Sequence, residues 1–600
     1  MTVKRKDVLV EDQWDLNSLY LSINDWKGEF EKLCPTGKPK WPEILSDHDI
    51  IKKGPEALKT LLDTFFTIDR QLSKLYTYVA RKQDEDLSNE ENKQALSLIF
   101  SLLQQFHEKI SWIEPEILAL DEAVFNEYLN SKILAPYHFF LEKLHKLKAH
   151  TLSADKEMLL AMTSKAFQAA PKAFEALNNA DFKFGKVKDG KNEDHELTHA
   201  SYNKIIRSHD RTLRKNAFKA FHQVFKEHEN GLAELLKGAI EHHVFVARAR
   251  KYPTSLEAAL YPNNIPTSVY HSLIEAVNEK LPVLHKYLDL RKKILNVGPL
   301  HLYDMYVPLT SDVHIEMSYK EAEDVIIEAV APLGEEYQSI LKKGFKEEGW
   351  VDRYENEGKR SGAYSSGCYD SHPYILMNFK GTLRDVFTLA HEAGHSMHTH
   401  LSKSQPYQYH SYPIFLAEVA STLNEELLMR HLLKKFTKKE EKIYLINEKI
   451  EDIRATLFRQ TMFAEFELLI HEKADKNEPL TPGIFKEIFH NLNRKYFGED
   501  VIIDEEALPE WSRIPHFYYN FYVYQYATGI SAALAIAKNI FEKGNQKEVL
   551  NFLKSGGSLY PIDALAKVGV DLRTKTPIIS ALDTFETLVD QMESLIQSKN

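Results

Sequence analysis

The motif HEAGH at residues 391–395 constrains the fold of this chain more than any other feature of its sequence. On an α-helix, residues four positions apart lie one turn from each other on the same face, and the motif is typical of a helix. From such a helix His391 and His395 can bind one metal ion, while Glu392 can reach a water molecule on the same ion. The pattern predicts a zinc site that carries out hydrolysis, with Glu392 as its general base.

A catalytic zinc site usually has three protein ligands and one open position, so a third ligand must come from elsewhere. Glu418 is the candidate, because it lies in the apolar run 414–419 and an unpaired buried carboxylate is unfavourable. The alternative is an ordinary glutamate on the solvent side of a helix. Glu425 lies seven residues further on, on the same helix face, and either orients a ligand imidazole or forms a salt bridge. His398 is a candidate for a similar orienting role or for a core histidine.

A second group of polar aromatic side chains lies far downstream, in HFYYNFYVYQY at residues 516–526. Neutral donors such as a tyrosine hydroxyl or an imidazole N–H can stabilise the oxyanion that forms during amide hydrolysis. Tyr522 and Tyr526 are four residues apart, so we expect them on one helix face beside His516. An aromatic stripe in a helical core is the alternative.

Apolar residues recur at helical spacing along most of the chain, which predicts a mainly α fold. These helical patterns cover residues 55–84, 90–112, 138–150, 154–167, 201–251 and 266–295.

Two short segments break the helical pattern. Residues 182–195 alternate and then contain the turn signal KDGK, which predicts a small hairpin. We place a domain boundary there, with residues 1–195 as an N-terminal helical region and 196–600 as a helical catalytic domain. Residues 374–379 predict a strand just before the motif helix, either buried in the core or available to pair with a peptide. Thr382 can cap the helix that follows.

Composition and charge exclude several classes of protein. The net charge of −11 is spread along the chain without a basic patch, which argues against nucleic-acid binding. No apolar run reaches the length of a membrane span, and the first residues do not resemble a secretory signal. The two cysteines, Cys34 and Cys368, form no disulfide framework. We therefore expect a soluble, cytoplasmic protein whose oligomeric state the sequence does not set.

Four segments, taken together and in this order, resemble oligoendopeptidase F of the thimet-oligopeptidase-like metallopeptidase family. They are GAYSSGCYDSHPYILMNF (362–379), FTLAHEAGHSMHTH (387–400), FLAEVASTLNEELL (415–428) and HFYYNFYVYQYATG (516–529). The resemblance covers nearly the whole chain. It implies a large multi-helical zincin-type fold with a small sheet beside the active-site helix and a deep substrate channel.

The resemblance also implies roles for individual residues. One zinc ion per chain would be held by His391, His395 and Glu418, with Glu392 as the catalytic glutamate. His516, Tyr522 and Tyr526 would stabilise the transition state, although Tyr518 or Tyr519 could replace one of these tyrosines. The expected function is that of a zinc oligoendopeptidase that cleaves internal bonds of short peptides, with the peptide paired antiparallel to the strand at 374–379.

Three other functions remain open at this point. The first is a helical zinc exopeptidase such as a carboxypeptidase, which would use the same chemistry. The second is a di-iron carboxylate protein, because such sites use Glu-x-x-His pairs and the chain also contains Glu142/His145 and Glu487/His490. The third is a peptide-binding protein without catalytic activity, against which the intact general base argues.

Overall fold

The computed structural model of the protein describes residues 3–310, 313 and 315–598. Within these residues the chain is mainly helical, as predicted, and the strands are two or three residues long. The chain divides into two compact units, each made of three separate stretches. Unit 1 comprises Met1–Ala149, His314–Leu432 and Ile536–Gly569, and unit 2 comprises His150–Val313, Leu433–Ala535 and Val570–Asn600. The predicted boundary near residue 195 stays a prediction.

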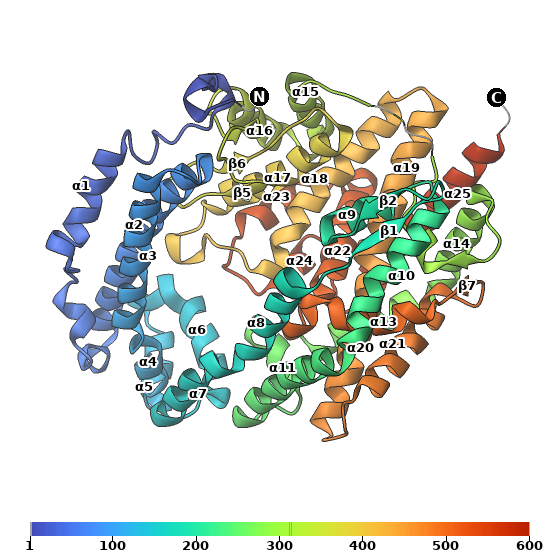
Figure 1. The fold of residues 1–600 in the computed structure, drawn as a ribbon. Helices are drawn as coiled ribbons and strands as arrows, with labels where there is room; N and C mark the ends of the chain where they lie inside the picture. The colour runs from blue at the N-terminus through green and yellow to red at the C-terminus, as the bar shows by residue number, and fades with distance from the viewer. Residues whose placement is uncertain (1–2, 311–312, 314, 599–600) are drawn as a thin grey trace. The chain divides into compact units, whose positions relative to one another are not determined.

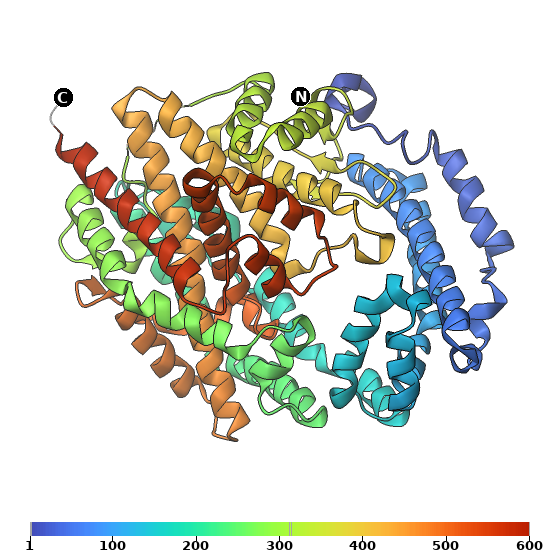
Figure 2. The ribbon, with the colours of Figure 1, turned by 180° about the vertical axis from the view of Figure 1, so that it is seen from behind.

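Unit 1 begins with helices that follow the predicted periodicity, and Figures 1 and 2 show α2 and α3 lying side by side. Helix α2 starts after Gly54, whose φ of 118° suits only glycine, with Pro55 in its first turn. The helices of this unit are α1 (Ile23–Leu33), α2 (Pro55–Glu85), α3 (Glu90–Ile110), α4 (Ile113–Leu118), α5 (Glu122–Leu129), α6 (His138–Leu147), α15 (Tyr319–Ala329), α16 (Glu335–Lys346), α17 (Leu383–Ser402), α23 (Gln546–Lys554) and α24 (Pro561–Lys567). Two further helices, α18 (Ile414–Lys435) and α22 (Tyr524–Lys543), contain a boundary between the units.

A small sheet lies beside α17 in unit 1. Its strands are β4 (Val351–Asp352), β5 (Tyr364–Ser366) and β6 (Tyr374–Leu376), in the order β4-β6-β5. β6 is fully buried, and its Tyr374 and Leu376 belong to the same hydrophobic core as the side chains of α1 to α6. The strand predicted at residues 374–379 is therefore present but shorter, and it is a core strand.

Unit 2 contains the predicted hairpin and the remaining helices. The hairpin pairs β1 (Lys186–Lys188) with β2 (Asp194–Glu196) antiparallel, and β3 (Leu300–His301) pairs with β7 (Val501–Ile502) in parallel. The single helical pattern predicted over 201–251 is divided into α9, α10 and α11. The helices are α7 (Ala154–Phe167), α8 (Ala169–Ala176), α9 (His199–Ile205), α10 (Arg211–Glu227), α11 (Glu229–Ala249), α12 (Ser255–Leu260), α13 (Thr267–Glu279), α14 (Leu281–Leu295), α19 (Lys439–Ile453), α20 (Gln460–Asp475), α21 (Pro482–Phe497) and α25 (Thr576–Gln597).

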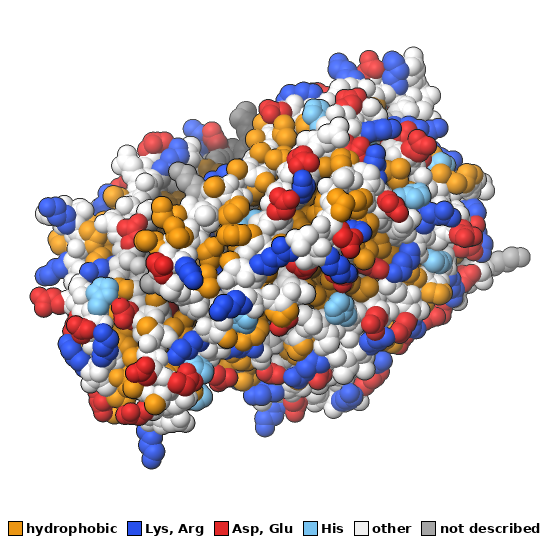
Figure 3. Space-filling view, turned by 90° about the horizontal axis from the view of Figure 1, so that it is seen from below, with side chains coloured by type: hydrophobic (Ala, Val, Ile, Leu, Met, Phe, Trp, Pro, Cys, Tyr) orange, Lys and Arg blue, Asp and Glu red, His pale blue; other side chains and the backbone are white. Residues whose placement is uncertain are grey.

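The surface carries charges of both signs. On the face shown in Figure 3, acidic and basic side chains are interspersed with smaller apolar areas. In the described part of the chain, no helix combines the length and the apolar character that crossing a bilayer requires.

Candidate metal centre and active site

The helix that carries the HEAGH motif begins where the sequence predicts. The Thr382 hydroxyl accepts the N–H of Asp385, and the Asp385 carboxylate accepts the N–H of Thr382, which completes a capping box before α17. Because α17 is regular from its first turn, His391 and His395 lie on one face of it. Their rings are 4.8 Å apart, centre to centre.

Three donor atoms converge beside this helix face. The Nε2 atoms of His391 and His395 are 3.2 Å apart, and Glu418 Oε2 of α18 lies 3.3 Å from the first and 3.6 Å from the second. Ligands placed 2.0–2.1 Å from a tetrahedral zinc ion are separated by roughly 3.3 Å. The spacing of the three donor atoms is therefore compatible with a zinc ion. The Glu418 side chain is 46% exposed, so the burial expected from the apolar run around it is wrong, and its role as the third ligand stays a prediction.

The donors are held in place by further contacts. Glu425 Oε1 lies 2.8 Å from Nδ1 of His391, and the ring of His395 bonds to the carbonyl of Ala417. These contacts turn both Nε2 atoms toward Glu418, which is the arrangement that metal-binding histidines usually show. The hydroxyl of Ser421 donates to Glu418 Oε2 at 3.0 Å.

The electrostatics of the group favour a bound cation. Burial lowers the pKa of His391, but hydrogen bonds to Glu418 and Glu425 outweigh it and raise this pKa to about 10. The hydrogen bond with His391 is also the main reason that the pKa of Glu418 falls to about 2. Burial and the charge of His391 lower the pKa of His395 to about 4. The site thus stabilises one positive charge among its carboxylates, which a proton or a metal ion can supply.

The glycine of the motif allows α17 and α18 to approach each other closely. A Cβ atom at Gly394 would lie 2.5 Å from the carbonyl oxygen of Ala420 and 2.6 Å from Cα of Ser421. Both atoms are main-chain atoms of α18, so they cannot move aside as a flexible side chain could. This close approach brings Glu418 within reach of the two histidines.

Glu392 lies between strand β5 and the metal-binding group. Its side chain is buried, and burial raises its pKa to about 7, against the opposing effects of His391 and of the Ser365 N–H. A carboxyl group with a pKa near neutrality can both accept and return a proton at physiological pH. Helix α17 is tied to β5 by a 2.8 Å hydrogen bond between the hydroxyls of Ser365 and Ser396.

The expectation that a peptide pairs with residues 374–379 is wrong. β6 is the central strand, with the N–H of Ile375 bonded to the Trp350 carbonyl of the β4 side and its other edge paired with β5. Within the described residues, β5 has no further strand partner, and its Ser365 N–H points to Glu392. Sequence reasoning missed β5 because its glycine- and serine-rich surroundings indicate a loop.

The other histidines and Glu-x-x-His pairs do not extend the metal-binding group. His398 is fully buried and stacks on Tyr412 at 3.6 Å between ring centres, so it is a core histidine. His145 pairs with Glu122 at 2.9 Å. Among the described residues, neither Glu142/His145 nor Glu487/His490 belongs to a group able to hold a metal ion, which removes the basis of the di-iron alternative.

The downstream aromatic residues form a second cluster, in unit 2. His516 Nε2 lies 3.2 Å from the Tyr526 hydroxyl, and the ring of Tyr522 is 6.0 Å from the imidazole and 5.5 Å from Tyr526. The predicted shared helix face is wrong, because α22 begins only at Tyr524 and Tyr522 precedes it. Burial lowers the pKa of His516, which favours the neutral imidazole.

The two alternative tyrosines differ in their surroundings. Tyr519 is 49% exposed, with its ring 6.0 Å from His516. Tyr518 is buried and stacks on Phe174. Tyr519 therefore stays a candidate donor beside His516, whereas Tyr518 is part of the core.

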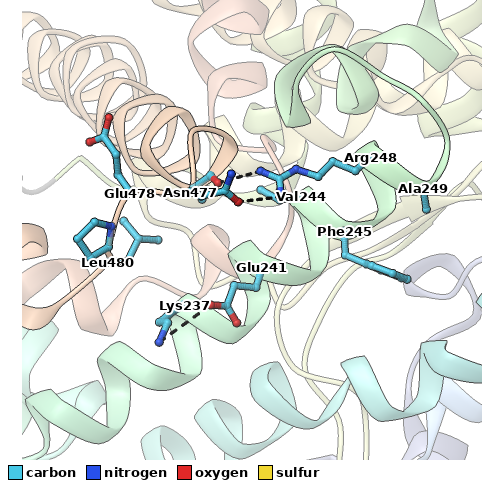
Figure 4. A pocket seen from close by; sticks show the side chains of 11 residues that line it. Lys237, Glu241, Val244, Phe245, Arg248, Ala249, Asn477, Glu478 and Leu480 are labelled. Atoms are coloured by element: carbon cyan, nitrogen blue, oxygen red, sulfur yellow. Dashed lines mark hydrogen bonds and ion pairs between the residues drawn. The ribbon is translucent and has the colours of Figure 1, made fainter.

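A pocket of about 720 Å³ in unit 2 lies between α11 and the segment that joins α20 to α21 (Figure 4). Arg248 lines this pocket and donates to Asn477 Oδ1 at 2.9 Å and to the Asp475 carbonyl at 2.8 Å. Its guanidinium therefore satisfies a carbonyl group at the C-terminal end of α20. None of the predicted site residues lines this pocket.

Comparison with known proteins identifies the family. The sequence profile of Peptidase family M3 matches residues 205–584, which is more than half of the chain. The chain belongs to peptidase family M3. Residues 116–184 of this M3 peptidase also match the profile described as Oligopeptidase F. The protein is thus a metallopeptidase, and the resemblance drawn from its four sequence segments is confirmed.

The M3 peptidase matches its relatives over nearly its whole length. It is 42% identical to Oligopeptidase PepF of Bacillus subtilis (strain 168) over 596 residues, which are 99% of this chain and 88% of that protein. A solved structure of a Chlamydophila abortus protein is 42% identical, with a TM-score of 0.95 and coverage of 99% of this chain and 100% of the other. The structure of oligoendopeptidase-F from Enterococcus faecium is 34% identical, with a TM-score of 0.72 and coverage of 96% and 100%.

Proposed function

We propose that this M3 peptidase is a zinc-dependent oligoendopeptidase that hydrolyses internal bonds of short peptides. The observation that carries the proposal is the spacing of 3.2 to 3.6 Å among the donor atoms of His391, His395 and Glu418. The restriction to short peptides and internal bonds is supported by the names of the relatives, Oligopeptidase PepF and oligoendopeptidase-F.

Each residue of the metal centre has a separate task in this proposal. His391, His395 and Glu418 hold one zinc ion, which when bound polarises the scissile carbonyl and acidifies a water molecule. Glu392 takes a proton from the attacking water on its carboxylate and gives it to the leaving amine. Glu425 keeps the ring of His391 in its binding orientation.

His516, Tyr522 and Tyr526 supply neutral donors to the oxyanion in this proposal. Support comes from their mutual contacts and from burial, which keeps His516 uncharged. Donors that are already oriented stabilise a developing negative charge without reorganisation. Removing one such donor is expected to reduce kcat about 10²- to 10³-fold.

The substrate backbone, we propose, pairs with the outer edge of β5. Support comes from the pairing of β6 on both sides and from the Ser365 N–H, which points to Glu392. Main-chain pairing recognises an extended peptide without reading most of its side chains. A broad range of peptide sequences is therefore expected to be cleaved.

The Glu392→Gln variant tests the proposal. It should bind one zinc ion per chain, measured by elemental analysis, and lose turnover of an internally quenched peptide by at least about 10²-fold, because the amide cannot accept the proton. The peptide should be blocked at both ends, so that cleavage by the wild type separates an endopeptidase from a carboxypeptidase. Full turnover by Glu392→Gln, or a wild type that requires a free peptide terminus, would contradict the proposal.

A further inference from the structure

The segment that carries the second cluster contains an unfavourable turn. Asn520 has a φ of 39° and Phe521 a φ of 57°, both in the left-handed region. Asparagine tolerates this region, but a bulky aromatic residue rarely adopts it. The turn separates Tyr519 from Tyr522 and delays the start of α22, so it determines where these two phenol groups lie.

A buried carboxyl group contacts this turn. Glu467 of α20 is fully buried, and its Oε1 accepts the N–H of Phe521 at 2.6 Å. The ring of Phe521 packs against His471 at 4.5 Å and Tyr270 at 5.5 Å between ring centres. The unusual conformation is therefore held from its backbone and from its side chain.

Within the described part of the chain, Glu467 has no ion-pair partner to account for its burial. Its Oε2 has no hydrogen-bond partner among the described residues. The nearby His471 uses Nδ1 on the Glu467 carbonyl and Nε2 on His243, at 2.8 and 3.1 Å. Burial raises the pKa of Glu467 to about 8, so at neutral pH the group is mostly an uncharged acid. A buried polar group with one unused oxygen is costly, and a purely apolar core would not need it.

We propose that Glu467 is a positioning residue, whose buried carboxyl holds the left-handed turn at Asn520 and Phe521 and thereby places Tyr522 beside His516. Its effect on catalysis rests on the proposed function, in which Tyr522 and His516 donate to the oxyanion. Its effect on the turn does not depend on that function, so the two can be tested separately.

The test compares two substitutions of similar size in the full-length, zinc-loaded protein. Glu467→Gln keeps an acceptor oxygen for the Phe521 N–H, whereas Glu467→Met removes it. We expect Glu467→Gln to retain kcat within about twofold. Glu467→Met should lower kcat about 10- to 100-fold at nearly unchanged KM and zinc content, by displacing one donor. Equal kcat in the two variants would overturn the effect of Glu467 on catalysis, and the measurement that follows tests its effect on the turn.

A spectroscopic measurement follows the turn itself. With 3-fluorotyrosine at position 522, the ¹⁹F chemical shift should change in Glu467→Met and not in Glu467→Gln. An unchanged shift in Glu467→Met overturns the positioning role. If the shift changes in Glu467→Met while kcat keeps its wild-type value, the positioning role is supported. The same result contradicts the proposed role of Tyr522 in the reaction.

A second variant, Glu467→Asp, tests the proposal if Glu467→Met does not fold. Its carboxyl group withdraws from Phe521 by about one carbon–carbon bond, so the hydrogen bond is lost or weakened. We expect the same direction of change in kcat and ¹⁹F shift. Wild-type values for both in this variant would overturn the proposal.

Discussion

At the scale of single residues, the metal centre depends on a side chain that does not reach the metal position. Oε1 of Glu425 lies 2.8 Å from Nδ1 of His391, and it is the other ring nitrogen, Nε2, that faces Glu418. The orientation of the imidazole, and hence the position of its Nε2, follows from that contact.

Replacing Glu425 by alanine should therefore weaken zinc binding about 10- to 100-fold, because the His391 ring is then free to rotate. Competition with a chromophoric chelator measures the affinity. Glu425→Gln is the matched control, since its side-chain oxygen still accepts the His391 N–H, and it should lose less affinity. Wild-type affinity in Glu425→Ala would show that the His391 ring is held by other contacts.

Glu467 gives a pH dependence that can be measured without activity. Its pKa is about 8 when folded, against an ordinary value of 4.5, because burial disfavours the charged form. The folded state thus retains a proton that the unfolded chain releases, and this contribution to stability is lost as pH rises from about 4.5 to 8. Among the facing groups, the pKa values of Tyr270 and Tyr524 are raised, away from this window. His471, whose pKa is lowered from 6.5 to about 4, changes stability in the lower part of the window, and a comparison with a Glu467 variant removes this shared contribution.

As the pH rises from 5 to 8, the Tm of the wild type should therefore fall relative to the Tm of Glu467→Gln. Above pH 8 the difference between the two Tm values should stay constant. Thermal unfolding at closely spaced pH values measures it. A Tm difference that stays constant over this range would mean that Glu467 is already ionised in the folded protein.

At the scale of elements, the site depends on how closely two helices pack. Gly394 leaves no side chain between α17 and α18, and the backbone of α18 occupies the space that a Cβ would need. Any displacement of α18 also moves Glu418, because this helix carries it.

Gly394→Ala should destabilise the protein by about 1–3 kcal/mol through overpacking, and should weaken zinc binding as Glu418 withdraws. Gly28→Ala in α1 is the control, because a Cβ there meets nothing within 4 Å, and alanine favours the helix by about 1 kcal/mol. Thermal unfolding and zinc titration of both variants test this. Equal effects in the two variants would show that the helices can separate without cost.

Some features of the helices could be predicted from the sequence. The shared helix face of His391 and His395, and that of Glu418 and Glu425, follow from helical periodicity, and the cap at Thr382 follows from local hydrogen bonding. These features depend on residues close together in the chain, so their patterns are visible in the sequence.

Features that depend on distant packing were not predictable. β5 is a three-residue strand that exists only because β6 is beside it, and its sequence shows no alternating apolar pattern. Tyr522 lies outside α22 because Glu467 and Tyr270 hold Phe521 at a positive φ, and no local signal marks a phenylalanine for that conformation. The assembly of each unit from three separate stretches is likewise absent from any local pattern.

At the scale of the whole molecule, the unit that contains the candidate metal centre includes a late part of the chain. Ile536–Gly569 belongs to unit 1, and within it Phe552 of α23 is buried and lies 5.7 Å from the His398 ring of α17. The motif helix therefore lacks part of its packing until this stretch is present.

A chain ending at Ala535 should fail to bind zinc at wild-type affinity and should unfold at a lower temperature. Phe552→Ala in the full chain should lose about 3–5 kcal/mol of stability while still binding zinc, because it removes one core side chain and not the helices. Zinc titration and thermal unfolding distinguish the two. Stoichiometric, tight zinc binding by the truncated chain would contradict this dependence.

The interleaving of the two units has a consequence during protein synthesis. The ribosome completes Glu418, the last of the three donors, before it makes Ile536–Gly569. At 5–20 residues per second, roughly ten seconds separate the two events. During this interval a nascent chain carries every metal-binding side chain but not the complete unit that holds them. We therefore expect the peptidase to become active only after Ile536–Gly569 has been made.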